Sequence, residues 1–459
     1  MLGDVPLGPL DGRYRPVVAP LTQHLSEAAL NRERVRVEVE WLIHLTRAGA
    51  LPGVRRLGED ETARLRRLVT DFDTAAVAEL AEIEAVTLHD VKAVEYYVKR
   101  RMEGTSLADL AELVHIFCTS EDVNNLAYAL MVRDAVRAVW LPAATALADD
   151  VATMARAYRD VPMLARTHGQ PATPTTLGKE LAVLAARLDR QLRRIGAAEY
   201  LGKINGATGT YAAHVIAAPG TDWVELSRSF VTGLGLTWNP LTTQIESHDW
   251  QAELYADVAR FNRVLHNLCT DVWTYISLGY FAQVRGQGTV GSSTMPHKVN
   301  PIRFENAEAN LEVSCALLDV LGSTLVTSRM QRDLTDSSMQ RNIGTAFGHS
   351  LLAVDNARRG LAGLDVDRAA LERDLDATWE VLGEAVQSVM RVNGLDRPYE
   401  RLKELTRGRR IDGPALREFV RGLDLPAADE ARLLSLTPAG YTGLAERLVD
   451  LLGQRPGGH

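Results

Sequence analysis

Long stretches of the chain repeat apolar residues at the spacing of an α-helix. Residues 254–275 show this most clearly, with steps of four and three between Leu254, Val258, Phe261, Leu265, Leu268, Val272 and Tyr275. A narrow apolar seam of this kind is typical of a long helix that packs against near-parallel neighbours. Residues 179–195, 122–158 and 303–327 are also expected to form long helices, the second of them bent at Pro142. Four long helices in the middle of the chain predict a helical bundle.

The two ends of the chain carry shorter periodic stretches. Residues 26–47 and 59–73 predict two amphipathic helices, and residues 366–459 predict several short helices separated by glycines and prolines. Runs of alternating β-branched residues are almost absent, which leaves no strands for a parallel sheet. We therefore expect an all-α fold of three helical domains. These are an N-terminal domain over residues 1–112, a central long-helix bundle over residues 113–365 and a C-terminal domain over residues 366–459.

A polar segment interrupts the helices at residues 291–301, which read GSSTMPHKVNP. Gly291 permits a backbone bend, Pro296 fixes a φ angle, and hydroxyl groups are followed by the cation of Lys298. This make-up predicts a loop that closes over an anion, with an ordinary surface linker as the alternative. Just before it, GQGTVG at 286–291 has the letters of a dinucleotide-binding fingerprint. Because that fingerprint has meaning only between a strand and a helix, and a long predicted helix precedes it here, dinucleotide binding is not expected.

Composition and charge narrow the classes of function. The chain has 459 residues, of which 46% are hydrophobic and 24% charged, as in folded globular proteins. A net charge of −8 argues against broad neutralisation of a nucleic-acid backbone, so we expect no nucleic-acid partner and an anion that is bound locally. Cys118, Cys269 and Cys315 are odd in number and widely spaced, which argues against a disulfide framework or a structural zinc site. Since no membrane span or signal peptide is recognised, we expect a cytoplasmic protein with no membrane partner.

Four further polar clusters stand out against the helical background. They read TLHDVKAVE at 87–95, HIFCTSEDVNN at 115–125, RTHGQPATP at 166–174 and SRMQRDLTDSSMQRN at 328–342. His168 is expected at a sharp turn ahead of the helix that begins near Leu177, where it can exchange a proton near neutral pH. The alternative is a histidine that bonds to its own turn. His89 and His115 precede or begin helical patterns, so each can equally be a capping group or a core group.

The last cluster and the polar loop suggest two kinds of chemistry. Arg329, Arg332 and Arg341 alternate with serine and glutamine side chains, which suits recognition of a phosphate or a carboxylate, and a solvated surface is the alternative. No two histidines of these clusters have the i, i+3 or i, i+4 spacing of metal ligands, so no metal site is expected. The loop letters GSSTM are not the GxSxG elbow of a hydrolase. A serine of this loop can instead act as a base if Lys298 and backbone amides stabilise its alkoxide.

Taken together, these motifs resemble a known family. GSSTMPHKVNP is similar to the signature loop of the fumarase and aspartase superfamily, and the loop extends here over residues 286–301. The blocks TLHD, CTSEDVNN, RTHGQPATP, GKINGATG, TTQIESHD and SRMQRDLTDSSMQRN resemble the adenylosuccinate lyase family within it, the bacterial long-chain type in particular. The similarity runs from DGRYRP near the N-terminus to PYERLKELTRGRR near the C-terminus, so it covers essentially the whole chain.

The resemblance implies an assembly and a reaction. The assembly is a homotetramer in which the long helices of the four chains form a twenty-helix core, and each active site is shared by three chains. The reaction is the β-elimination of fumarate from a purine nucleotide, either adenylosuccinate or the succinyl-aminoimidazole-carboxamide ribotide, without a metal or an organic cofactor. In this scheme Ser292 is the general base, His168 is the general acid, and Lys298 and Asn300 stabilise the developing negative charge.

The same matching implies a set of substrate-binding residues. They are Arg13, Tyr14, Thr87, His89, Asp90, Thr119, Ser120, Gln244, Asn300, Asn306, Arg332, Ser337, Ser338 and Arg341, with His115 and Glu305 in supporting roles. Glu305 is expected to orient His168 or its neighbours. Two alternatives stay open, namely another lyase of the superfamily such as argininosuccinate lyase, and a catalytically silent scaffold of the same fold. The arginines after the loop favour a nucleotide substrate, and the intact Ser292, His168 and Lys298 argue against a scaffold.

Overall fold

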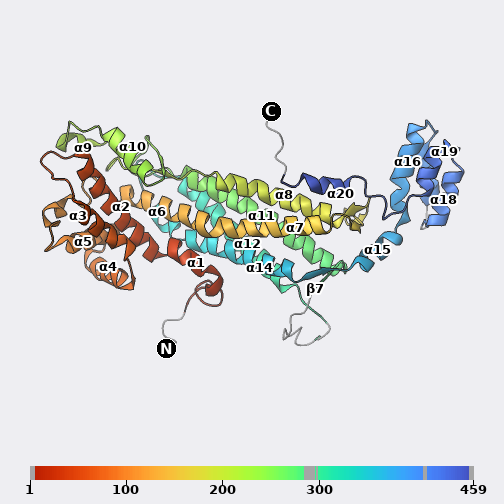
Figure 1. The fold of residues 1–459 in the computed structure, drawn as a ribbon, viewed down its shortest axis with the longest axis horizontal. Coiled ribbons are helices and arrows are strands. Elements are labelled where there is room, and N and C mark those ends of the chain that lie inside the picture. The colour runs from red at the N-terminus through yellow and green to blue at the C-terminus, as the bar shows by residue number, and fades with distance from the viewer. Residues whose placement is uncertain (1–5, 284–294, 296–297, 407–410, 454–459) are drawn as a thin grey trace. The chain divides into compact units, whose positions relative to one another are not determined.

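The computed structural model describes residues 6–283, 295, 298–406 and 411–453 (Figure 1). The chain divides into two compact units. Unit 1 comprises residues 1–144, 191–263 and 309–355, and unit 2 comprises residues 145–190, 264–308 and 356–459. Helices make up nearly all of the regular structure, so the predicted all-α class is confirmed. The limits of the two units fall inside long helices. They therefore do not test the predicted domain boundaries after residues 112 and 365, which stay a prediction.

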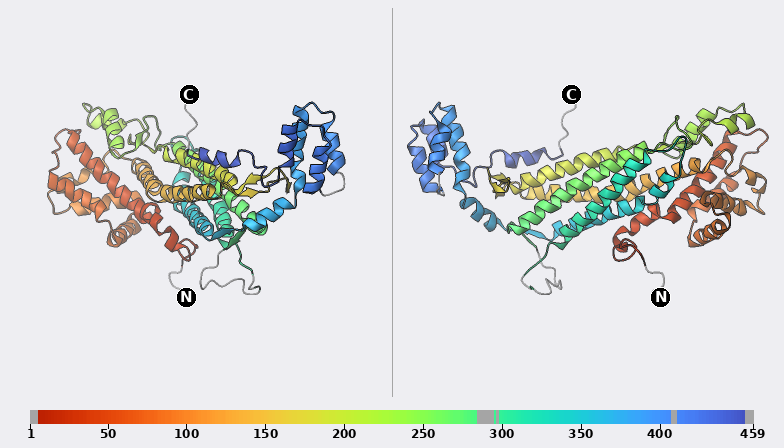
Figure 2. Two further views of the ribbon diagram at one scale, coloured as in Figure 1. Left: turned by 45° about the vertical axis from the view of Figure 1, so that its right-hand side comes forward. Right: turned by 180° about the vertical axis from the view of Figure 1, so that it is seen from behind.

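Of five long helices in the central part of the described chain, four fall in the stretches predicted to be long helices and the fifth, α14, was not predicted, and Figure 2 shows them from two further directions. They are α7 (Leu141–Ala157), α8 (Leu177–Gly196), α11 (Asp249–Ser277), α12 (Ile302–Leu325) and α14 (Ile343–Ala362). The predicted seam on α11 is buried, since its residues from Leu254 to Val272 are at most 2% exposed. Burying such a side chain contributes roughly 1.5–3 kcal/mol, so the seam determines which face of α11 is inside. Among the described helices, none has the length and apolar character to cross a membrane.

The bend predicted near Pro142 is a change of helix type. Residues Ser120–Ala135 form α6, Val136–Trp140 form one turn of π-helix (η2), and α7 follows. The N–H of Leu141 donates to the carbonyl of Val136, which is the i to i−5 bond of a π-helix. Because Pro142 has no N–H to continue the ordinary ladder, the interruption lies directly before it.

Unit 1 contains further helices besides these and α6. They are α1 (Arg15–Leu25), α2 (Glu27–Ala48), α3 (Glu59–Thr70), α4 (Thr74–Thr87), α5 (Asp90–Met102), the 3-10 helix η1 (Ala108–Leu113), α9 (Ala212–Ala217), α10 (Trp223–Gly233) and α13 (Thr335–Gln340). Helices α2 and α3 confirm the two amphipathic helices predicted near the N-terminus. Buried residues such as Val39, Leu65, Leu80 and Val98 join α2 to α5 in one apolar cluster. This cluster positions the start of α5, where the predicted site residues His89 and Asp90 lie.

Unit 2 contains shorter helices, most of which share a second core. They are α15 (Arg368–Asp376), the 3-10 helix η3 (Trp379–Leu382), α16 (Gly383–Val392), α17 (Pro398–Thr406), α18 (Gly413–Arg421), α19 (Ala427–Leu434), α20 (Ala445–Leu448) and the 3-10 helix η4 (Val449–Leu451). Buried Leu375, Met390, Leu402 and Val420 belong to this core, and Leu164 joins it from the segment that leads to His168. The predicted series of short C-terminal helices is therefore confirmed.

Strands are short and pair two by two in the described residues. The antiparallel pairs are β1 (Pro162–Met163) with β4 (Thr175–Thr176), β2 (Arg166–Thr167) with β3 (Gln170–Pro171), and β7 (Phe281–Gln283) with β8 (Leu364–Val366). The pair of β5 (Leu201–Gly202) and β6 (Thr237–Trp238) is parallel but spans only two residues on each side. No extended parallel sheet occurs among the described residues, which agrees with the rejection of a dinucleotide fold. The GQGTVG segment itself lies outside them.

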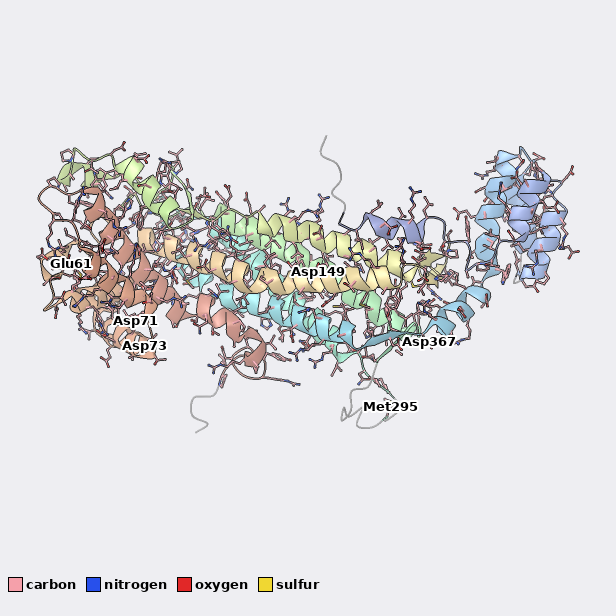
Figure 3. All side chains as sticks on the ribbon, viewed as in Figure 1. Glu61, Asp71, Asp73, Asp149, Met295 and Asp367 are labelled. Carbon is pink, nitrogen blue, oxygen red and sulfur yellow. The ribbon has the colours of Figure 1, made fainter. Side chains whose placement is uncertain are left out.

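Carboxylates at the N-terminal ends of helices explain where several of them begin (Figure 3). Asp73 Oδ1 accepts a hydrogen bond from the N–H of Ala76 at the start of α4, and Asp367 Oδ1 accepts one from Ala370 at the start of α15. At the start of α3, Glu61 Oε2 accepts from the N–H of Gly58. Each such cap satisfies a donor that the helix leaves free and typically contributes about 1 kcal/mol.

Candidate active site

The predicted residues divide between the two units. Unit 1 holds Arg13, Tyr14, Thr87, His89, Asp90, His115, Thr119, Ser120, Gln244, Arg332, Ser337, Ser338 and Arg341, and unit 2 holds His168, Lys298, Asn300, Glu305 and Asn306. Ser292, the predicted general base, lies outside the described residues. Each unit therefore carries its own part of the predicted set.

In unit 1, Asp90 lies between two arginines. Its Oδ2 accepts from Arg34 Nη2 at 2.7 Å and from Arg341 Nη2 at 3.2 Å. Its Oδ1 accepts from the N–H of Val91 at 2.8 Å. Burial alone raises the pKa of Asp90, but the charge and hydrogen bond of Arg34 outweigh it, so the pKa lies below its ordinary value. The ionised carboxylate can therefore hold the guanidinium group of Arg341, which also binds Glu27 Oε1 at 2.8 Å.

Arg34 is a buried member of this cluster that the sequence did not point to. Its side chain is 2% exposed. Its Nε donates to Asn124 Oδ1 at 2.9 Å, and its Nη1 donates to Asn31 Oδ1 at 3.1 Å. Together with the bond to Asp90, these contacts join α2, α5 and α6. Arg34 therefore positions Asp90, and a ligand anion has little access to it.

Arg332 is held by two side chains from other segments of unit 1. Its Nη2 lies 2.9 Å from Glu121 Oε1, and its Nη1 donates to Gln244 Oε1 at 3.4 Å. Gln244 Nε2 in turn donates to the carbonyl of Ala207 at 2.8 Å. Glu121 is 1% exposed, and burial raises its pKa although Arg332 acts in the opposite direction. The guanidinium group is therefore oriented from two sides before any ligand binds.

His115 forms a close pair with Glu38, a residue of α2. Its Nδ1 lies 2.6 Å from Glu38 Oε1, and the glutamate is only 1% exposed. Burial by itself lowers the pKa of His115, but the hydrogen bond and charge of Glu38 outweigh it, so the pKa is raised. His115 has a positive φ of 64°, which points to backbone constraint at this residue. Of the two predicted possibilities, a cap or a core group, the bond to buried Glu38 favours the core group.

The segment of residues 328–342 is anchored by buried polar contacts. His248 Nε2 lies 3.4 Å from Asp336 Oδ2, and Gln251 Nε2 donates to Gln340 Oε1 at 3.1 Å. Asp336 Oδ1 also accepts from the N–H of Ser337 at 2.7 Å. These bonds fix the buried side of α13 to the start of α11. Its other side carries Ser338, whose side chain is exposed.

The remaining predicted residues of unit 1 named below lie at or next to helix ends. His89 is the N-cap of α5, since its Nδ1 accepts from the N–H of Lys92 at 3.2 Å, and Thr87 Oγ1 donates to the carbonyl of His89. The predicted capping possibility for His89 is thus confirmed, and its side chain is still 53% exposed. Thr119 and Ser120 begin α6, and Arg13 and Tyr14 precede α1, with the Arg13 guanidinium 5.8 Å from the Tyr14 ring centre.

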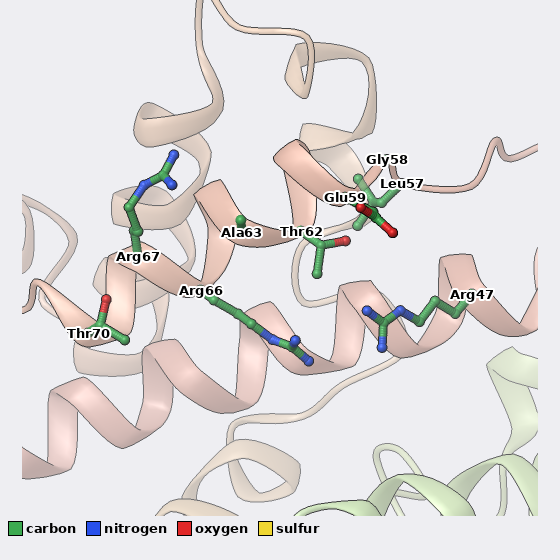
Figure 4. Close-up of a pocket in the computed structure, with 9 residues that line it drawn as sticks. All are labelled: Arg47, Leu57, Gly58, Glu59, Thr62, Ala63, Arg66, Arg67 and Thr70. Atoms are coloured by element: carbon green, nitrogen blue, oxygen red, sulfur yellow. The ribbon is translucent and has the colours of Figure 1, made fainter.

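Two hollows in unit 1 differ in their relation to these residues. One of about 380 Å³ is lined by Thr243, Ile245 and Ser328, on either side of Gln244 and at the start of the arginine-rich segment. A larger groove of about 680 Å³ lies between α2 and α3, where Arg66 points toward α2 and binds Glu40 (Figure 4). The lining of the larger groove contains none of the predicted residues. Volume therefore does not identify the candidate site, and the polar network does.

In unit 2, His168 lies at the tip of the hairpin formed by β2 and β3. Its φ of 53° and the φ of 74° at Gly169 make the tight reversal, and its imidazole is exposed. At the base of the hairpin, Arg166 donates to Tyr280 OH at 2.7 Å and to Asp374 Oδ2 at 2.6 Å. The predicted turn at His168 is confirmed, since α8 begins only at Leu177. The anchored hairpin presents the imidazole to solvent, where a substrate can reach it.

The other predicted residues of unit 2 lie at the start of α12. Lys298 is exposed, and Gln283 Nε2 donates to the carbonyl of Val299 at 2.8 Å, which ties the segment before α12 to β7. The buried Oδ1 of Asn300 has no hydrogen-bond partner in the described part of the chain. Glu305 Oε1 accepts from Trp273 Nε1 at 3.2 Å. No bond between Glu305 and His168 is present within the described residues, so the orienting role stays a prediction.

Several residues of these networks were missed by sequence analysis. They are Arg34, Glu38, Glu121, Asp122, Lys203, His248 and Asp336, all nearly or fully buried. Charged residues are rarely buried without a partner, but a sequence shows neither burial nor partner. Glu121, Asp122 and Asp336 stood within recognised polar clusters, and Lys203 and His248 stood within the blocks GKINGATG and TTQIESHD, but nothing in these blocks marked the residues as buried or paired. No group of three metal-binding side chains was found among the described residues.

Comparison with known proteins places the chain among lyases. A model of the lyase family matches residues 12–315, and a model of the C-terminal part of adenylosuccinate lyases matches residues 328–442. The adenylosuccinate lyase of Escherichia coli K12 is 49% identical over 447 residues, which cover 97% of this chain and 98% of that protein. The adenylosuccinate lyase of Haemophilus influenzae is 47% identical over the same shares of both chains. The similarity thus extends over both units.

Solved structures share the fold. The fumarate lyase of Mesorhizobium sp. BNC1 superimposes with a TM-score of 0.77 at 21% identity, over 95% of this chain and 98% of the other. The 3-carboxy-cis,cis-muconate lactonizing enzyme of Pseudomonas putida gives a TM-score of 0.73 at 23% identity, over 94% and 95% of the two chains. At this level of identity the likeness shows the architecture alone.

Proposed function

The chain belongs to the adenylosuccinate lyase family and is a carbon–nitrogen lyase, and on this premise we propose how its residues divide the work of eliminating fumarate. The observation that carries the function is the near-full-length identity with adenylosuccinate lyases, including the match to their C-terminal model. The substrate is adenylosuccinate, which yields AMP and fumarate. The succinyl-aminoimidazole-carboxamide ribotide is the second substrate that we propose.

We propose that unit 1 binds the anionic groups of the substrate. Arg332 and Arg341 support this proposal, because carboxylates orient both guanidinium groups and both side chains stay partly exposed. The exposed fraction is 20% for Arg332 and 40% for Arg341. A phosphate or a succinyl carboxylate can form two parallel bonds with such a guanidinium group. Ligand binding then replaces part of the contact with Glu121, Glu27 or Asp90. Gln244 and Thr119 complete this surface.

We propose that unit 2 supplies the acid and the residues next to the base. Ser292 removes the proton from the carbon beside the succinyl carboxylate, the carbon–nitrogen bond breaks, and His168 protonates the departing nitrogen. The exposed His168 imidazole on an anchored hairpin supports the acid role. Lys298 and the Nδ2 amide of Asn300 stabilise the negative charge that develops on the carboxylate. A positioned acid or base typically contributes about 10² to 10⁴ in rate.

We propose a homotetramer in which three chains share each active site. Apolar side chains that stay exposed on the long helices support it. Val313 and Val320 on α12 are each 44% exposed and seven residues apart, and Trp273 on α11 and Val183 on α8 are 42% and 46% exposed. Exposed apolar positions at a heptad interval are typical of a helix that packs against a further helix. We also place the protein in the cytoplasm, a location that the unpaired Cys118, Cys269 and Cys315 support.

A spectrophotometric assay of fumarate release tests the function. The purified chain is incubated separately with adenylosuccinate, the succinyl-aminoimidazole-carboxamide ribotide and argininosuccinate. We expect turnover of the first two and none of the third. Preference for argininosuccinate would assign the chain to a different lyase activity, and absence of turnover on all three would support a silent scaffold.

A further inference from the structure

Asp122 is a fully buried carboxylate that joins two distant segments of unit 1. Its Oδ2 accepts from the N–H of Thr119 at 2.9 Å. Its Oδ1 accepts from Lys203 Nζ at 2.8 Å and from the N–H of Asn205 at 2.9 Å, and the N–H of Gly206 lies 3.2 Å from Oδ2. The side chains of Asp122 and Lys203 are both 0% exposed, and the two residues are 81 positions apart in the chain.

The free energy of this ion pair suggests a role other than stabilising the fold. Removing two charges from water is costly, and replacing a buried ion pair by apolar residues is often neutral or stabilising. What apolar residues cannot do is accept hydrogen bonds from the backbone. Here the Asp122 carboxylate satisfies three backbone N–H groups in two segments, so its removal would release both segments together.

One route leads from Asp122 through the turn after Lys203 to the candidate site. Asn205 Nδ2 donates to Thr242 Oγ1 at 2.7 Å, and the carbonyl of Ala207 accepts from Gln244 Nε2. Gly209 has a φ of +76°, and a Cβ there would lie 2.4 Å from the carbonyl oxygen of Thr242. The turn therefore approaches the segment of Gln244 as closely as a glycine allows.

A second chain of contacts leads from Asp122 through the first turn of α6 to Arg332, the partner of Gln244. Asp122 and Thr119 form the reciprocal cap of α6, and Glu121 is the residue between Ser120 and Asp122 in that first turn. Glu121 Oε1 lies 2.9 Å from Arg332 Nη2, and Gln244 Oε1 accepts from Arg332 Nη1. Both segments that Asp122 joins therefore meet again at the guanidinium group of Arg332.

We propose that Asp122 is a positioning residue for Arg332, with Lys203 as its counter-ion. By fixing the first turn of α6 against the turn at residues 205–207, the pair sets the distance between the Glu121 carboxylate and the Gln244 amide. That distance determines the direction in which Arg332 faces a substrate anion. The inference rests on the proposed function, because it takes Arg332 as a substrate-binding residue.

The test separates positioning from stability by means of three variants and a control. Asp122→Asn and Lys203→Met each leave one buried partner uncompensated, and the double variant Asp122→Asn/Lys203→Met removes both charges. Ser227→Ala is the matched control, because Ser227 Oγ is buried and bonds to the carbonyl of Ile204 at 2.8 Å in the same segment but lies outside both routes. Melting temperature, KM and kcat for adenylosuccinate are measured for each.

We expect Asp122→Asn to raise KM by about ten- to hundredfold, the loss typical of a displaced hydrogen bond to a charged group. The double variant should regain melting temperature relative to Lys203→Met and keep the raised KM. Ser227→Ala should keep the wild-type KM. Recovery of KM together with melting temperature in the double variant would reduce the pair to a structural role and overturn the inference.

A double-mutant cycle and a structure supply readouts that a purely structural role would not change. In a Gln244→Ala background, Asp122→Asn should raise KM far less than in the wild type, whereas independent effects would argue against the route. A crystal structure of unliganded Asp122→Asn should show the contacts among Ala207, Gln244 and Arg332 lost. If they are retained, the inference fails while the proposed function stands. If wild-type protein releases no fumarate but those contacts are lost in the variant, the proposed function fails, whereas the positioning of Arg332 by Asp122 stands.

Discussion

The imidazole of His115 and the carboxylate of Glu38 lie 2.6 Å apart in unit 1, between residues that are 77 positions apart in the chain. The glutamate lies on the buried face of α2, and the histidine lies in the segment between η1 and α6. The pair therefore fixes the entry to α6 against α2 and places a titratable group beside the predicted binding residues.

The raised pKa of His115 gives this pair a defined pH dependence. Because the folded pKa lies above the unfolded value of about 6.5, the stabilisation is fully present below that value and is lost as the pH rises through the folded pKa. In Glu38→Gln we expect a lower His115 pKa, measured from the imidazole resonances by NMR. The melting temperatures of variant and wild type should differ most at low pH. Glu40→Gln is the control, because Glu40 is a half-buried carboxylate on the same helix that pairs with Arg66, and an equal shift of the His115 pKa in both variants would contradict the assignment.

His168→Ala should abolish most of the turnover and leave the fold intact. The side chain is exposed at a hairpin tip, so its removal creates no cavity, whereas loss of a positioned acid typically costs about 10² to 10⁴ in rate. Initial rates of fumarate release and circular dichroism measure the two effects. Near-normal rates in His168→Ala would transfer the acid role to another residue. Ser292→Ala is expected to be equally inactive and tests the base in the same way.

Mixing two inactive variants tests the shared active site. If Ser292 and His168 reach one site from different chains, random exchange between Ser292→Ala and His168→Ala tetramers restores about a quarter of the sites. The measurement is fumarate release after subunit exchange, with exchange verified by mass spectrometry of tagged chains. Activity that stays at the level of the separate variants after verified exchange would mean that one chain supplies both residues.

Arg332→Ala should raise KM for adenylosuccinate with a smaller effect on kcat. Loss of a charged hydrogen bond to the substrate is worth about 1.5–3 kcal/mol, or roughly ten- to hundredfold in KM if the interaction is the same in ground and transition states. Arg329→Ala is the matched control, because that side chain belongs to the same segment but is 83% exposed and pairs only with Asp333 among the described residues. Equal effects of both substitutions would indicate a general change in charge and no specific contact.

Arg34→Ala should be far more destabilising than Arg66→Ala. Arg34 is 2% exposed, and its loss leaves Asn124 Oδ1 without its donor and Asp90 with Arg341 as its remaining cation, and removal of one partner of a buried ion pair typically costs about 3–5 kcal/mol. Arg66 makes two good bonds to Glu40, but it is 46% exposed, and such surface pairs contribute about 1 kcal/mol or less. Urea unfolding of the two variants measures the difference. Similar losses would mean that the Arg34 network is not rigid in solution.

The predicted binding residues differ in how far local sequence foretold their surroundings. His168 was expected at a turn from its neighbouring glycine and prolines, and its hairpin has that turn. Arg332 was expected to face an anion, but its own partners, Glu121 and Gln244, come from distant segments that no local pattern connects. The predicted roles of both residues stay predictions, because contacts in the unliganded chain show orientation and not catalysis.

The sequence by itself determined the helices, because the spacing of apolar residues is a local property of the backbone and α11 buries the face that its seam marks. It also determined the available chemistry, since histidines, serines and arginines stand in recognisable blocks. Only the tertiary structure decided which charges meet. Asp122 finds Lys203, and Arg34 finds Asp90, because packing brings distant helices together and excludes water from between them. Because water is excluded, a buried charge depends on its partner in the protein, and the pair in turn fixes the segments that carry it. No local stretch of sequence shows this exclusion of water.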